Sequence, residues 1–270
     1  MKRIFRLFFL FLIPFFLIRF ATLAETDPST GFFTGGKYGH FLYIVSLALA
    51  ALTSFVAAIR FRRLQVIPEA PEAPSLLLQI LMCLSALFSL QQLLLPPLTS
   101  HISSRALSVG VFFVYVTSHL LSAAFFFLLA INKSLPSTVL SDLFASSPAV
   151  AFASQMLFLY AQEPVNLHDS LTVLSLLCEA SLAVAWLRYC SALLAGSTAA
   201  FPSAVGFSTL ALYLSVGFRL PEVFISAPSF LRIISILHHV FCSLTLMVMT
   251  LDSIPDSRKQ SADTSEENDG

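Results

Sequence analysis

Charged side chains are scarce in this chain. Only 11% of its 270 residues are Asp, Glu, Lys or Arg, which is less than half the share of a soluble domain. The formal net charge is zero, so the chain lacks the basic character of a nucleic-acid binder. It is 57% hydrophobic, contains 27 Phe and has a mean hydropathy of +0.84. The composition excludes a soluble globular protein and a nucleic-acid binder, and it predicts an integral membrane protein surrounded by the lipid bilayer.

Paired cysteines and complete catalytic motifs are also missing. The residues 31–38 follow the phosphate-loop pattern up to the last position, but Tyr38 stands where Ser or Thr would hold magnesium. We interpret the glycines of this segment as turn residues. The sequence resembles no family closely enough to name one. We predict no disulfide, no metal and no cofactor, because the four cysteines lie in apolar stretches without CxxC spacing: Cys83, Cys178, Cys190 and Cys242.

Eight apolar segments predict the fold class, an all-α polytopic transmembrane helical bundle of about eight spans. The separators are rich in Pro, Ser, Asp and Glu, and the segments lack the alternation of membrane barrel strands. The segment 143–161 is the most polar of them. The segments cover residues 4–24, 40–59, 75–95, 106–131, 143–161, 170–194, 203–218 and 229–251.

The chain divides into three parts. Residues 1–24 form a signal-anchor or a cleaved signal peptide, because the basic start, the apolar run and the small residues before position 25 suit both. Cleavage would leave seven spans, but Arg19 lies close to the cleavage site and favours an uncleaved anchor. Residues 25–252 form the integral membrane helical domain. Residues 253–270 form a polar tail that its composition predicts to be disordered.

The positions of Lys and Arg predict the topology. With eight spans and a cytoplasmic N-terminus, ten of the fifteen basic residues lie on the cytoplasmic side. The cluster Arg60, Arg62 and Arg63 follows a full apolar segment and is the firmest anchor. We therefore predict a multi-pass protein, most simply of the plasma membrane, whose N-terminus and C-terminal tail are cytoplasmic.

Four ionisable residues lie at mid-span depth. Glu179 lies near the centre of its segment, as do His119 and the adjacent pair His238 and His239. Because mid-span depth is independent of helix direction, these side chains can meet at one level. An acid at this depth costs about 2.5–3.5 kcal/mol on insertion scales, so Glu179 should face protein or trapped water. Three interpretations stay open: a structural role in which hydrogen bonds hold the helices together, a proton or solute pathway, and a metal or catalytic site.

A stripe of small residues marks the second segment. Ser46, Ala50, Ser54 and Ala58 recur every four residues and so lie on one helix face. Such a stripe permits close approach of another helix, either within the same bundle, which we favour, or in a second copy of the chain.

The sequence predicts function only coarsely. Because mass outside the membrane is small and no catalytic motif is complete, we expect a non-enzymatic membrane component or a subunit of a complex, with other membrane proteins or its own copies as partners. The first alternative is a secondary transporter or channel with a Glu/His pathway for protons or solutes. An intramembrane enzyme ranks last.

Overall fold

The computed structural model describes residues 10–27, 33–34, 37–63, 74–93, 105–131, 139–162, 170–194, 196–225 and 229–254. Over these ranges the chain is helical, apart from turns and one isolated bridge between Thr26 and Phe33. Most of the predicted tail, from residue 255 onward, lies outside the described ranges.

Each of the eight predicted segments contains a helix. The helices are α2 (Leu12–Leu23), α3 (Lys37–Arg63), α4 (Leu76–Gln92), α5 (Arg105–Ile131), α6 (Val139–Gln162), α7 (Ser170–Leu194), α8 (Ala200–Leu212) and α10 (Phe230–Asp252). The helix α8 continues without a break into a π-helical stretch, η1 (Tyr213–Arg219), and then into α9 (Leu220–Ile225).

Five helices in the described part of the chain are long and apolar enough to cross a membrane. They are Tyr38–Arg63, Val109–Ile131, Ser170–Leu194, Ala200–Ile225 and Phe230–Asp252, whereas α2 and α4 are apolar but shorter. By length and composition, the chain is therefore a multi-pass helical membrane protein. The count of eight spans stays a prediction.

The segment predicted over 203–218 is longer than expected. The helix continues past Pro221 to Ile225, although proline commonly ends a helix because it lacks an amide proton. Just before the proline, the N–H of Leu220 bonds to the carbonyl of Ser215, five residues back. We attribute the continuation to this wider π register, which brings Arg219 and Glu222 into the helix instead of a loop.

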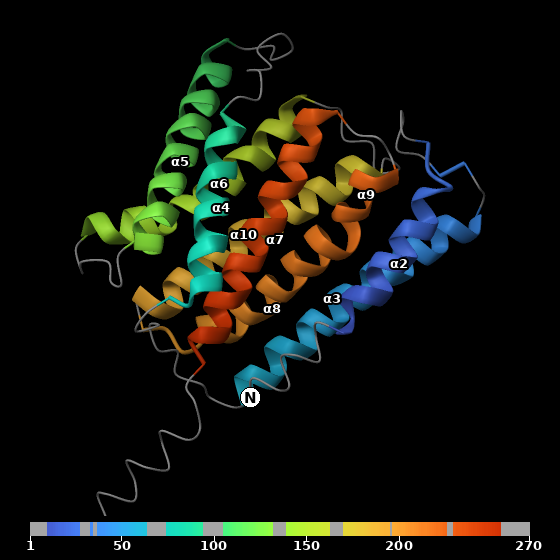
Figure 1. The fold of residues 1–270 in the computed structure, drawn as a ribbon, viewed down its shortest axis with the longest axis horizontal. Coiled ribbons are helices and arrows are strands. Elements are labelled where there is room, and N and C mark those ends of the chain that lie inside the picture. The colour runs from blue at the N-terminus through green and yellow to red at the C-terminus, as the bar shows by residue number, and fades with distance from the viewer. Residues whose placement is uncertain are drawn as a thin grey trace, which may run out of the picture.

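The helix α10 occupies the middle of the bundle. The helices α4, α5, α6, α7 and α8 pack in chain order, and α10 contacts α4, α7 and α8. Figure 1 shows α10 in red between the teal α4 and the orange α8. The helix α3 packs outside α8, and α2 lies across α3, η1 and α9. Residues carried by α10 therefore face several neighbouring helices at once.

The bundle exposes large apolar side chains and buries charged and polar side chains within an otherwise apolar core. Phe55 and Phe113 are 62% and 69% exposed, whereas Glu179 and Arg219 are 0% and 2% exposed. A soluble protein shows the reverse distribution. This pattern suits a lipid environment, in which polar side chains face the interior of the bundle.

The small-residue stripe of α3 packs on α8. A Cβ added at Gly206 of α8 would lie 2.9 Å from the Cβ of Ala58 and 3.2 Å from the backbone oxygen of Ser54. Ser46 and Ala50 are also buried. In this structure the stripe therefore serves packing within one chain. The topology residues Arg60, Arg62 and Arg63 lie exposed in the last turn of α3.

A candidate polar site inside the bundle

Two adjacent histidines on α10 organise the polar interior. His238 and His239 are both buried, and neighbouring residues on an α-helix point about 100° apart. His239 accordingly meets α7 and η1, whereas His238 meets α4 and α5.

His239 bridges a carboxylate and a guanidinium. Its Nε2 is hydrogen-bonded to Oε1 of Glu179, and its Nδ1 to Nη1 of Arg219. Arginine has only donors, so Nδ1 must accept and carries no proton. The ring is then neutral, with its proton on Nε2, which donates to Glu179. The three residues form a Glu179–His239–Arg219 triad in which one cation balances one anion.

The π-helical stretch brings Arg219 into this triad. Arg219 is its last residue, and the wider turn changes the direction in which the following side chains point. Two residues earlier, a Cβ at Gly217 would lie 3.1 Å from the Cβ of Phe15, so α2 packs closely on this stretch. Ser215 and Ser243 share a hydrogen bond of 2.6 Å that ties the stretch to α10. π-Helical turns occur often at functional sites.

His238 and His119 form the second half of the interior. Nε2 of His238 lies 3.1 Å from Oγ of Ser89 on α4. The ring centroids of His238 and His119 are 5.6 Å apart, and those of His238 and His239 are 5.9 Å apart. The ring of Phe152 stacks on His238 at 5.1 Å. The structure thus brings His119, His238, His239 and Glu179 to one level, contributed by α5, α10 and α7.

Several polar atoms at this level have no hydrogen-bond partner. They are both ring nitrogens of His119, Nδ1 of His238, Oε2 of Glu179, Nε of Arg219 and both side-chain polar atoms of Gln92. Buried polar groups are normally hydrogen-bonded, and leaving one unpaired in an apolar medium costs several kcal/mol. The site therefore offers free donors and acceptors to water or to a transferred proton.

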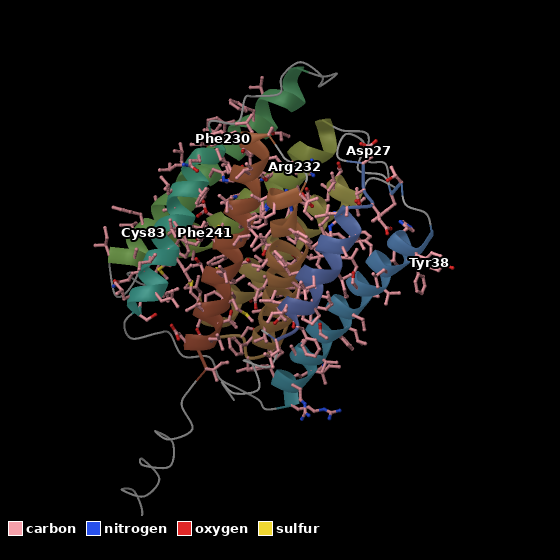
Figure 2. The ribbon with its side chains drawn as sticks, turned by 45° about the vertical axis from the view of Figure 1, so that its right-hand side comes forward. Asp27, Tyr38, Cys83, Phe230, Arg232 and Phe241 are labelled. Carbon is pink, nitrogen blue, oxygen red and sulfur yellow. The ribbon has the colours of Figure 1, made fainter. Side chains whose placement is uncertain are left out.

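A second cluster of charges lies toward one end of the bundle. The carboxylate of Glu222 is 3.6 Å from Arg19 of α2 and 3.3 Å from Arg232 of α10. The guanidinium of Arg19 also lies over the ring of Tyr43, 4.8 Å from its centroid. Arg232 is 34% exposed, whereas Arg19 and Glu222 are fully buried. Figure 2 shows Arg232 at the end of the bundle where Phe230 and Asp27 also lie.

Polar contacts continue along α10 toward the other end. Ser85 of α4 lies 2.9 Å from Thr245, and the hydroxyl of Tyr189 lies 3.1 Å from that of Ser253 in the last turn. Hydrogen-bonded or charged side chains thus follow α10 along most of its length. Among the described residues, no group of three or more His, Cys, Asp or Glu could hold a metal ion.

The sequence placed His239 at the depth of Glu179, but it missed Arg219 as the second partner of His239 and Glu222 as the partner of Arg19. The four ionisable residues predicted at mid-span depth include neither Arg219 nor Glu222. In the structure Arg219 and Glu222 lie one helical turn apart inside the bundle, at a spacing of three residues that places both on one helix face. This spacing was the available signal.

The chain matches no protein-family model, no curated protein and no solved structure. Its functional assignment therefore rests on the geometry of the site.

Proposed function

We propose that this chain moves protons across a membrane, as a channel or a secondary transporter, through the interior level that holds Glu179, His239, His238 and His119. The observation that carries the proposal is the set of unpartnered polar atoms around a buried carboxylate. Carboxylates and imidazoles exchange protons near neutral pH, and ionisable residues inside membrane bundles commonly mark proton relays.

In the proposed pathway these groups have different roles. Arg219 holds Nδ1 of His239, so this ring cannot pass a proton from one nitrogen to the other. His239 is therefore a positioning residue that orients Glu179. The free Oε2 of Glu179 can accept a proton, and so can the one unprotonated ring nitrogen of His119. Nδ1 of His238 can do the same when Nε2 of that ring donates to Ser89. A proton entering at His119 or His238 would reach Oε2 of Glu179 through water. Glu179 would then stay neutral until the proton is released.

The second candidate is a non-enzymatic subunit whose triad only locks helices. The two hydrogen bonds that link Glu179, His239 and Arg219 favour this candidate, because they join α7, α10 and η1. A purely structural cluster, however, stabilises the bundle most when every buried polar atom has a hydrogen-bond partner. The unpaired atoms of His119 and His238 favour the proton pathway.

The test is proton flux into vesicles that contain the reconstituted protein and a pH-sensitive dye, driven by a potassium diffusion potential. The wild-type chain should acidify the lumen faster than empty vesicles do. Glu179→Gln removes the titratable group with little change in shape and should abolish the flux. Glu25→Gln makes the same change at an exposed carboxylate and should leave the flux unchanged.

Two results would contradict the proton pathway. A wild-type flux no greater than that of empty vesicles would leave the structural subunit as the better description. An unchanged flux in Glu179→Gln would show that protons do not pass through this carboxylate. His119→Phe adds a second readout, because it removes the free nitrogens from a buried position and should also lower the flux.

A further inference from the structure

An elongated groove lies between α3 and α8, away from the polar interior. It encloses about 990 Å³, a volume at the upper end of the range for small-molecule sites. Ser54, Ala58 and Gly206 line it where the two helices are in close contact. Its apolar walls include Phe55 and Phe207, which are 62% and 37% exposed. Both helices are long and apolar enough to span a membrane, and in a bilayer the groove would face lipid chains.

One end of the groove is positively charged. Arg62 lines it there, in the last turn of α3, and Arg60 and Arg63 lie in the same turn. Hydroxyl groups of Thr198 and Ser203 also line the groove, and none of its lining residues is acidic. Figure 2 shows nitrogen atoms projecting from the lower end of α3, opposite the end where Arg232 lies.

We propose that this groove binds one anionic phospholipid, with an acyl chain between Phe55 and Phe207 and the phosphate at Arg62. Arginine forms short, charge-assisted hydrogen bonds with phosphate oxygens. The positive-inside pattern predicts this end of α3 at the cytoplasmic face, where membranes carry their anionic lipids. The occupant therefore matches the groove in polarity along its length and in charge at its end. The inference is independent of the proposed proton pathway.

The test compares two lipids and two arginines. The purified chain is titrated in detergent micelles with phosphatidylglycerol or with phosphatidylcholine of the same chains, and bound lipid is counted by native mass spectrometry. The wild-type chain should retain one phosphatidylglycerol in preference to phosphatidylcholine. Arg62→Ala should weaken this binding about tenfold, because one charge-assisted contact is lost. Arg60→Ala is the matched control: Arg60 is also exposed but does not line the groove, so its loss should change binding less than twofold.

A second variant tests the acyl-chain part of the groove. Ser203→Leu places a larger side chain in the groove and leaves Arg62 unchanged. It should also lower the retention of phosphatidylglycerol. The melting temperature of each variant without added lipid shows whether the fold is intact. The same titration with inorganic phosphate separates a lipid site from a site for the free anion.

Four outcomes would overturn the inference. Equal retention of the two lipids would show that the headgroup charge is not recognised. Equal losses for Arg60→Ala and Arg62→Ala would show diffuse attraction to a basic surface. Retention of inorganic phosphate as strong as that of phosphatidylglycerol would show an anion site without a chain site. A dimer that dissociates on Ser203→Leu would show that a second copy of the chain fills the groove.

Discussion

Glu179 and Arg219 should depend on each other for stability, although they do not touch. Both are hydrogen-bonded to His239, and all three residues are buried. The prediction concerns the variants Glu179→Leu and Arg219→Met and their combination. Each single change removes one charge and leaves the other inside the bundle without compensation, whereas the double change removes both.

The expected magnitudes follow from the burial. Breaking a buried ion pair by removing one partner costs about 3–5 kcal/mol, so each single variant should lose about that amount. Replacing both charges by apolar groups of similar size is often close to neutral. The double variant should then lose about 1–3 kcal/mol, because His239 is left without its two partners. The predicted coupling energy therefore exceeds about 3 kcal/mol.

The chain contains its own reporter for this measurement. Trp186 is the only tryptophan, it is buried, and its ring packs edge to face against Phe126 at 5.3 Å. Its fluorescence should change when α7 separates from α5. Unfolding is followed by titrating a harsh detergent into mild micelles, and the four free energies of unfolding form a double-mutant cycle.

Additive losses would refute this reasoning. If the double variant lost the sum of the two single losses within about 0.5 kcal/mol, the two charges would not be energetically linked. The ring of His239 would then not transmit an interaction between them, and the triad would be three separate contacts.

Two further predictions concern the ends and the packing of the bundle. Glu222→Leu leaves Arg19 buried without its carboxylate and should lower the free energy of unfolding by about 3–5 kcal/mol. Arg19→Leu should lower it less, because Glu222 keeps the partly exposed Arg232 as a partner. Equal losses for the two variants in the same unfolding titration would contradict this order. Gly206→Ala would place a Cβ 2.9 Å from a side-chain carbon of α3 and should lower stability by about 1–3 kcal/mol. Gly110→Ala, with open space around its Cβ, should instead raise stability by up to about 1 kcal/mol, and a loss at Gly110 as large as that at Gly206 would show that helix packing is not the cause.

The helices could be predicted because lipid solvation acts on long, continuous stretches of chain. A run of about 20 apolar residues suffices to predict a helix, and each of the eight predicted segments contains one. The depth of Glu179 and of the three histidines could be read in the same way, from their distance to the segment ends. The side of the helix on which a neighbour packs cannot be read from one segment, so the pairing of His239 with Glu179, and of His238 with Ser89, required the structure.

The charged residues near segment ends were harder to place. An apolar segment is taken to end before the first charged residue. The predicted segment 203–218 therefore left Arg219 and Glu222 in a loop. In fact both are buried, because partners on other helices compensate their charges. Arg19 lies within the predicted segment 4–24, but its pairing with Glu222 on another helix could not be read from that segment. The π-helical stretch that carries Arg219 lies just before Pro221 and packs against α2, and a count of apolar residues shows neither the π register nor this packing.

The balance of charge between Glu179 and Arg219 affects whether the site inside the bundle can take up and release a proton. Glu179 is opposed by Arg219 through a neutral ring, so the triad carries no net charge when the carboxylate is ionised. A proton taken up by Oε2 would neutralise Glu179 and leave the buried cation of Arg219 without a balancing charge. In the proposed pathway the release of the proton restores this balance, so the protonated state is transient. A bound proton that can leave again is the condition for conduction.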